Sequence, residues 1–460
     1  MEPETLPLAP PEQVLATLNP DGTRRWLAPR LAKGRFWRRR RILGYVLIVI
    51  FNALPWIPID GKPAMLLDVV AREFTFFGVT FRPTETVLVV ALFLTIFLAV
   101  FLMTAIFGRV WCGWGCPQTV YLEFLYRPIE RLIEGRYYTK GRDAVPAWRK
   151  AVTLAVFFVA SLHLAHTFLA YFVGATTVID WSTSPPSEHP AGFAIVYVVT
   201  GLMVFDFASF REQMCTLACP YGRLQSALVD PSSVVIGYDP GRGEPRGKGK
   251  RGVQKTAHLG DCVDCKLCVA VCPTGIDIRD GLQMECVQCA ECIDACDSVM
   301  DRLGMERGLV RYASQVEFDG GERKLVRPRT LFYSIGLAAA ALAFLTFLGT
   351  RQDTLVDLLR VNNVPFVVLD DGQVSNLVRV RIENRAEQVR TYTLAPVGPG
   401  VTTSPEVLTL EVGPAGTAQL TFNVVTSAGV FQAGRADLQL RVTDGAGFET
   451  LVERPLLGPR

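Results

Sequence analysis

The chain has 460 residues, of which 50% are hydrophobic and 20% are charged, and its formal net charge at pH 7 is +3. A charge so close to neutral argues against a nucleic-acid-binding protein, and the length suggests about two to four domains. The mean hydropathy is +0.26, which is unusual for a soluble protein with this many charges and indicates that the apolar residues are concentrated in blocks.

Five segments are long and apolar enough to cross a bilayer, which requires about 20 residues. In chain order they are residues 41–57, 87–107, 152–173, 193–210 and 331–348. The second is the clearest, whereas Asn52 and Pro55 interrupt the first, so that a re-entrant or interfacial segment is an alternative there. No cleavable signal peptide is expected, because the N-terminus shows no short apolar region that ends in small residues.

The loops alternate between rich and poor in Lys and Arg. Four consecutive arginines, Arg38 to Arg41, end the N-terminal tail, and the segments after the second and fourth spans are also basic, whereas residues 174–192 contain no Lys or Arg. Positively charged loops stay in the cytoplasm. We therefore expect a multi-pass protein of the bacterial inner (cytoplasmic) membrane, with the N-terminus and all twelve cysteines on the cytoplasmic side and the C-terminal region in the periplasm.

Two Cys-x-x-x-Cys-Pro motifs, Cys112/Cys116 and Cys215/Cys219, follow the second and fourth spans at the same membrane depth. Cysteines four residues apart project from one face of a helical turn. If the two spans pack together, the four thiols converge, and thiolates favour Cu(I), zinc or an iron–sulfur cluster. Inert buried cysteines, or a dithiol that cycles with a disulfide, are the alternatives.

Two histidines in the third span are weaker candidates for a metal site. His163 and His166 lie three residues apart and share a helix face. Ionisable groups inside a membrane are functional candidates, but hydrogen-bonded histidines in the interior of a bundle are equally consistent with the pattern. No Cys-x-x-Cys-His occurs, so a covalent c-type haem is not expected.

A repeated cysteine pattern follows a basic, Gly-rich segment at residues 239–255, which is expected to be a flexible linker, with docking of an acidic electron donor as an alternative. Each half of the repeat reads Cys-x-x-Cys-x-x-Cys-x-x-x-Cys, the spacing of bacterial two-cluster ferredoxins, in which the fourth cysteine binds the other cluster. The predicted ligands of the two [4Fe–4S] clusters are Cys262, Cys265, Cys268 and Cys296 for one, and Cys272, Cys286, Cys289 and Cys292 for the other. A pair of zinc sites is the alternative. Asp297 stands where a proline usually follows the last cysteine.

The C-terminal region alternates in the manner of β-strands. Candidate strands are residues 374–382, 389–394, 407–412, 417–424, 436–442 and 448–452. Six or seven short strands separated by Gly, Pro, Asn and Asp favour an immunoglobulin-like β-sandwich. This region contains no cysteine and no catalytic constellation, so an interaction or stabilising role is expected.

These features predict a membrane protein with five transmembrane α-helices, a bacterial-type 2[4Fe–4S] ferredoxin insert and a C-terminal immunoglobulin-like β-sandwich. The expected divisions are a basic tail (1–40), four transmembrane helices (41–210), a cytoplasmic region (211–330) with the ferredoxin segment at 260–300, a fifth helix (331–349) and the periplasmic domain (355–460).

The order of these motifs, with WCGWGCPQTV, then REQMCTLACPYGRLQ, then the double ferredoxin run and a C-terminal sandwich, resembles the CcoG/FixG/RdxA family of accessory proteins for the assembly of cbb-type cytochrome oxidase. The resemblance covers nearly the whole chain after the first thirty residues. It implies a cupric reductase, in which electrons pass through two clusters to copper(II) at Cys112, Cys116, Cys215 and Cys219. It also implies copper-handling and oxidase-assembly proteins as partners.

Three functions remain open at this point. The first is reduction of copper(II) for oxidase assembly. The second is a quinol-oxidising membrane ferredoxin subunit, which would need a quinone pocket near the spans. The third is a non-enzymatic metal-carrying scaffold, for which eight cluster ligands are hard to explain. The sequence does not identify the electron donor, and a homodimer is a reasonable expectation.

Overall fold

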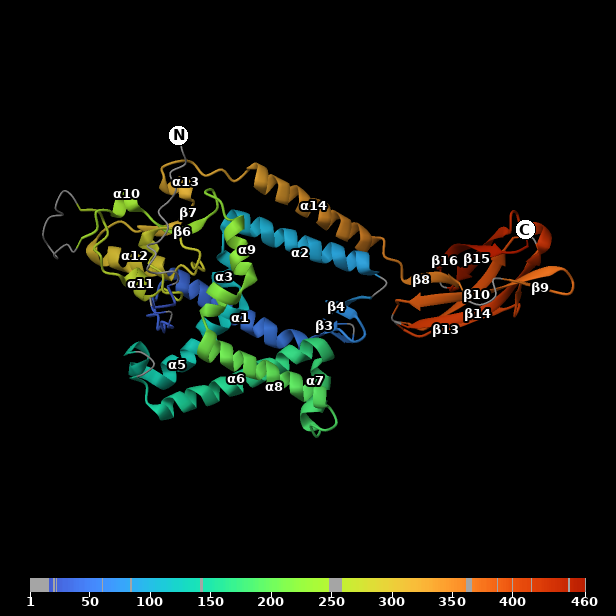
Figure 1. Cartoon of the computed structure of the whole chain (residues 1–460), viewed down its shortest axis with the longest axis horizontal. Helices are drawn as coiled ribbons and strands as arrows, with labels where there is room; N and C mark the ends of the chain where they lie inside the picture. Colours follow the sequence, from blue (N-terminus) through green and yellow to red (C-terminus); the bar gives the residue numbers. More distant parts are fainter. Residues whose placement is uncertain are drawn as a thin grey trace. The chain divides into compact units, whose positions relative to one another are not determined.

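The computed structural model describes residues 16–459 apart from residues 20, 22, 60, 83–84, 141–143, 248–258, 361–365, 387, 399, 415 and 446. The chain divides into two compact units, Met1–Leu345 and Thr346–Arg460 (Figure 1). The first unit contains every cysteine, and the second is a β domain, so each unit is described by itself.

Four helices of the described chain are long and apolar enough to cross a membrane. They are α2 (Thr86–Phe107), α6 (Ala147–Val173), α8 (Pro190–Phe205, continued by a π-helical turn to Phe210) and α14 (Pro328–Gly349). They match the last four predicted spans, so the prediction of a membrane protein is confirmed. Large apolar side chains are exposed along them, as lipid-facing helices require.

The helix α1 (Arg35–Ala53) covers the first predicted span but is not among these four. Five of its first seven residues are arginines, so its apolar part begins only at Ile42 and is about 18 Å long. A hydrocarbon core is about 30 Å thick. Pro55, in the 3₁₀ turn Leu54–Trp56, then ends the helix. The first of the five predicted spans therefore stays a prediction.

Short elements connect the long helices. Five strands follow α1, namely β1 (Pro58–Ile59), β2 (Lys62–Pro63), β3 (Met65–Asp68), β4 (Glu73–Phe76) and β5 (Val79–Phe81). After α2 come α3 (Val110–Trp114), α4 (Pro117–Tyr121), a π turn (Leu122–Tyr126), α5 (Arg127–Glu134) and a 3₁₀ turn (Gly135–Lys140), and after α6 comes α7 (Ala175–Thr183).

The ferredoxin segment packs against the ends of the long helices. Its elements are α9 (Pro220–Leu228), β6 (Val235–Tyr238), α10 (Pro240–Gly243), α11 (Leu267–Ala270), a 3₁₀ turn (Ile278–Asp280), α12 (Glu291–Leu303), β7 (Val310–Ala313) and α13 (Gln315–Phe318). The strands β6 and β7 pair antiparallel and close the segment. Val234 N donates to Ile106 O (2.9 Å), and Arg327, just before α14, donates to Ala105 O (2.5 Å). The last turn of α2 and the start of α14 are thereby fixed to it.

The basic segment expected to be a flexible linker is ordered at its start. Asp239 caps α10 by accepting from Arg242 N, and the Arg242 side chain pairs with Asp261 at 2.6 Å. Capping and an ion pair therefore fold residues 239–243, in contrast to the prediction. Residues 248–258 lie outside the described part.

The second unit is a sandwich of two antiparallel sheets. One contains β12 (Val401–Ser404), β14 (Thr417–Ser427), β10 (Gln373–Asn384), β8 (Thr354–Arg360) and β9 (Val367–Val368), and the other β13 (Leu408–Val412), β11 (Arg390–Val397), β15 (Arg435–Thr443) and β16 (Glu449–Leu457). Alternate side chains such as Ile382, Tyr392, Phe422 and Leu440 are fully buried between the sheets. The predicted immunoglobulin-like fold is confirmed. The strands β8, β9 and β12 lie outside the predicted strand ranges.

Candidate metal centre

The eight ferredoxin cysteines line two small cavities. One cavity is lined by Cys262, Cys265, Cys268 and Cys296, and the other by Cys272, Cys286, Cys289 and Cys292, with Cys268 between them. This is the crossed partition that the spacing predicts, because the last cysteine of each run reaches the other cavity. The donor set and its grouping therefore fit two [4Fe–4S] clusters.

The backbone explains why these loops can wrap a cluster. Asp264 and Lys266 in the first run, and Gln288 and Ala290 in the second, adopt left-handed conformations with φ between 49° and 65°. These residues stand at equivalent positions of the two runs. The left-handed residues turn the chain so that successive cysteines face one point, and α11 and α12 begin directly after them. The strained left-handed backbone therefore occurs at the same two positions of each cysteine run.

The same geometry bears on the zinc alternative. Among the described residues, no three Cys, His, Asp or Glu side chains are grouped as ligands of one metal ion. The four thiolates of a [4Fe–4S] cluster bind four different irons and are spread more widely than the ligands of a single zinc ion.

The two Cys-x-x-x-Cys-Pro motifs share one local architecture. Cys112 lies on α3 and Cys215 on the π turn Met214–Ala218, while Cys116 and Cys219 are the N-cap residues of α4 and α9, each of which begins with proline. Proline is favoured at the first position of a helix because a backbone N–H there has no acceptor within the helix, so proline's lack of an N–H loses no hydrogen bond. The backbone is extended at each N-cap, and its N–H donates to the carbonyl five residues earlier: Cys116 N to Trp111 O (2.9 Å) and Cys219 N to Met214 O (2.8 Å).

The four thiols of these motifs lie close enough to influence one another. Burial, with a smaller contribution from the neighbouring thiols, raises the pKa of Cys215 to about 12, and burial also raises the pKa of Cys112 and Cys116. The buried thiols are therefore protonated at neutral pH, and a metal ion that binds them must displace protons. The structure brings the two motifs to one place.

This four-thiol group lies directly against the second cluster loop. Cys112, Val287 and Cys289 are buried in one apolar cluster, with Cys215 and Tyr221 packed on it. Gly113 permits the contact, because a Cβ at this position would lie 2.4 Å from Val287 O and 2.9 Å from Cys289 N. The Cys289 cavity and the four thiols are therefore adjacent.

Polar residues that sequence reasoning missed surround this junction. Gln225 is fully buried, and its Oε1 accepts from Cys112 Sγ (3.0 Å) and Arg109 Nε (3.3 Å). Arg109 also donates to Met284 O. Gln225 follows Cys219 by six residues, and a polar residue in the helix after the motif was the available signal.

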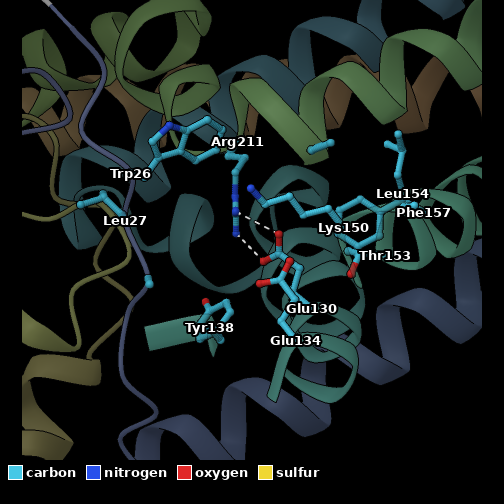
Figure 2. A pocket seen from close by; sticks show the side chains of 13 residues that line it. Trp26, Leu27, Glu130, Glu134, Tyr138, Lys150, Thr153, Leu154, Phe157 and Arg211 are labelled. Carbon is cyan, nitrogen blue, oxygen red and sulfur yellow. Dashed lines mark hydrogen bonds and ion pairs between the residues drawn. The ribbon is translucent and has the colours of Figure 1, made fainter. Parts of the chain in front are cut away.

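A chain of buried ion pairs links the membrane helices to the cluster loops. Arg211 pairs with Glu130 at 2.8 Å, beside a cavity of about 210 Å³ that Figure 2 shows. Glu212 pairs with Arg127 at 3.4 Å, and Arg127 donates to Pro273 O next to Cys272. Removal of one member would leave a buried charge unpaired.

The two histidines have local partners. His163 Nε2 lies 2.8 Å from Asn52 Oδ1 of α1, and His166 Nδ1 lies 2.7 Å from Leu162 O in its own helix. The His163 contact joins α6 to α1, and both contacts match the alternative of hydrogen-bonded bundle histidines. The structure does not bring either histidine together with the cysteines.

Comparison with known families supports the redox assignment. A profile described as "4Fe-4S dicluster domain" matches residues 210–315, and one described as "4Fe-4S binding domain" matches residues 89–136, which include Cys112 and Cys116. A profile described as "IG-like fold at C-terminal of FixG, putative oxidoreductase" matches residues 344–459.

Two relatives align with this chain over about four fifths of its length. Protein RdxA of Cereibacter sphaeroides is 35% identical over 391 residues, which are 80% of this chain and 82% of the relative. The nitrogen fixation protein FixG of Rhizobium meliloti is 34% identical over 424 residues, which are 83% of this chain and 80% of the relative. A crystal structure of a FixG-related protein from Vibrio parahaemolyticus covers 24% of this chain and 100% of its own, at 19% identity and a TM-score of 0.21.

Proposed function

The chain belongs to the FixG/RdxA family, and we propose that this membrane iron–sulfur electron-transfer protein reduces copper(II) to copper(I) for the assembly of a cbb-type cytochrome oxidase. The contact between Cys112 and the Cys289 loop carries the proposal. This contact brings a cluster-binding loop next to the four thiols of the Cys-x-x-x-Cys-Pro motifs. Thiolates are soft ligands that favour Cu(I) over Cu(II).

The chain's own residues set a direction for the electrons. Among the twelve cysteines only Cys265 is exposed, so the cavity that it lines is the one nearest to an outside donor. Cys268 lies between the two cavities, and Cys289 shares a buried cluster with Val287 and Cys112. Bound in these cavities, the clusters pass single electrons. The proposed route runs from Cys265 through Cys268 and Cys289 to Cys112, where one electron converts copper(II) to copper(I).

We place this reaction on the cytoplasmic side of a bacterial inner membrane. The basic tail and basic loops support that orientation through the distribution of Lys and Arg. The same charge distribution supports a periplasmic location for the immunoglobulin-like domain. Copper-handling and oxidase-assembly proteins are proposed as partners from the family resemblance, and a homodimer is proposed as the assembly.

Anaerobic copper(II) reduction by the purified, dithionite-reduced and desalted protein tests the proposal. We expect the double variant Cys116→Ala/Cys219→Ala to keep about eight irons per chain and to lose reduction. Equal rates in the variant and the wild type would show that copper takes electrons directly from the clusters. The proposed copper site would then be wrong.

One observation favours the quinol-linked alternative. A mostly apolar cavity of about 530 Å³, a size typical of small-molecule sites, is lined by Cys286, Arg109 and Leu282. A quinol in it would lie beside a cluster ligand. Bleaching of the cluster absorbance by a short-chain ubiquinol, in the absence of copper, would favour this function.

A further inference from the structure

Arg40 is the one residue of the arginine run whose side chain is completely buried, and it lies at the junction between the Cys289 loop and the Cys112 turn. Its Nη1 donates to Glu291 Oε1 (2.7 Å), at the start of α12 between Cys289 and Cys292. Its Nε donates to Gly113 O (2.8 Å), beside Cys112. The Arg40 side chain therefore forms hydrogen bonds both to the Cys289 loop and to the Cys112 turn, the two sites between which electrons are proposed to pass.

The guanidinium lies over the Phe124 ring, 5.6 Å from its centroid, but its third nitrogen makes no hydrogen bond to the described residues. Arg40 Nη2 is buried and has no hydrogen-bond acceptor among the described residues. An arginine in a protein is always charged, and a buried donor without an acceptor is costly. Arg40 also lies close enough to Cys289 for a direct electrostatic interaction. A cluster held by Cys289 offers sulfur atoms, which accept hydrogen bonds, in this neighbourhood.

The arginine near the other cavity differs in this respect. Arg279 lines the cavity of Cys262 and Cys265, but its Nε and Nη2 donate to Asp277 (2.8 and 2.6 Å) and its Nη1 donates to Asp264 (2.7 Å). All three of its side-chain nitrogens are used by carboxylates. Arg279 therefore has every side-chain nitrogen engaged, whereas Arg40, near Cys289, keeps Nη2 without an acceptor among the described residues.

We propose that Arg40 donates a hydrogen bond from Nη2 to the sulfur of the cluster held by Cys289 and so raises its reduction potential above that of the other cluster. Reduction adds negative charge to a cluster, and donors and positive charge near its sulfurs stabilise the reduced form. An electron would then rest at the cavity of Cys289, which shares a buried cluster of side chains with Cys112. Arg40 acts as a positioning and tuning residue, and this inference rests on the proposed direction of electron flow.

A redox titration followed by electron paramagnetic resonance, with the full-length protein in detergent and without copper, tests the inference. The variant Arg40→Met/Glu291→Gln removes the donor without leaving a buried charge unpaired. We expect it to keep its iron and to show a lower potential for one cluster only, with an altered signal. Arg40→Lys keeps the charge and is expected to restore part of the shift. Arg39→Met, at an exposed neighbour in the same run, is the matched control.

The outcomes separate this inference from the copper proposal, because no copper is present. A Cys265→Ser variant marks the signal of the other cluster and so assigns the shift. Unchanged potentials in the double variant with full iron content would overturn the inference, as would a shift confined to the cluster that Cys265 marks. If the double variant loses its clusters, unchanged potentials in Arg40→Lys would overturn it as well.

Discussion

Replacement of Gly113 by alanine should separate the four thiols from the cluster loop. A Cβ at this position would lie 2.4 Å from Val287 O, whereas ordinary contact begins at 3.4 Å, so the two backbones must move apart by about 1 Å. Overpacking of this kind costs about 1–3 kcal/mol. If about 1.4 kcal/mol of it appears in the electron-transfer step, copper(II) reduction slows about tenfold.

The assay is stopped-flow copper(II) reduction by the prereduced protein, with iron content and thermal unfolding measured in parallel. Gly201→Ala is the matched control, because Gly201 lies on α8 with no atom within 4 Å of an added Cβ. Alanine also favours a helix by up to about 1 kcal/mol over glycine, so the control should be neutral or stabilising. Equal rates and equal stability for the two variants would refute the inferred contact between the Cys112 turn and the Cys289 loop.

Three further substitutions test the packing around the junction and in the second unit. Asp294 accepts from the backbone N–H groups of Phe36 and Trp37, so Asp294→Ala should destabilise the start of α1 by about 1–2 kcal/mol, read as a lower thermal midpoint that Asp294→Asn largely restores. Arg127→Met leaves the buried Glu123 without its ion-pair partner, while Glu212 keeps Arg24, and should cost about 3–5 kcal/mol in denaturant unfolding; a neutral result would mean that Glu123 takes up a proton. Phe422→Ala empties a fully buried site of the sandwich and should cost about 3–5 kcal/mol, measured by protease resistance of that unit, with iron content unchanged.

The sequence predicted those features that repeat along the chain. Apolar blocks predicted the long helices, and alternation predicted most strands of the sandwich, because both depend on near neighbours in the sequence. The cysteine spacing likewise predicted the partition of the eight cysteines between two cavities. The contacts of Arg40 could not be predicted in this way, because Glu291 is 251 residues away in the chain. The predicted linker began with a cap and an ion pair, which composition alone does not reveal.

The arginine run contains both exposed and buried charges, and only the exposed ones bear on membrane orientation. Arginines near the N-terminus support a cytoplasmic location only if they are free to act on membrane insertion. Arg40, in the run, is buried against Glu291, and Arg24, upstream of the run, pairs with Glu212 at 3.0 Å. Arg38, Arg39 and Arg41 remain exposed. Three exposed arginines at the start of an apolar stretch still favour the cytoplasmic side. The run therefore combines three exposed arginines, on which the expected orientation rests, with Arg40, which fastens α1 to the cluster loop and to the thiol turn.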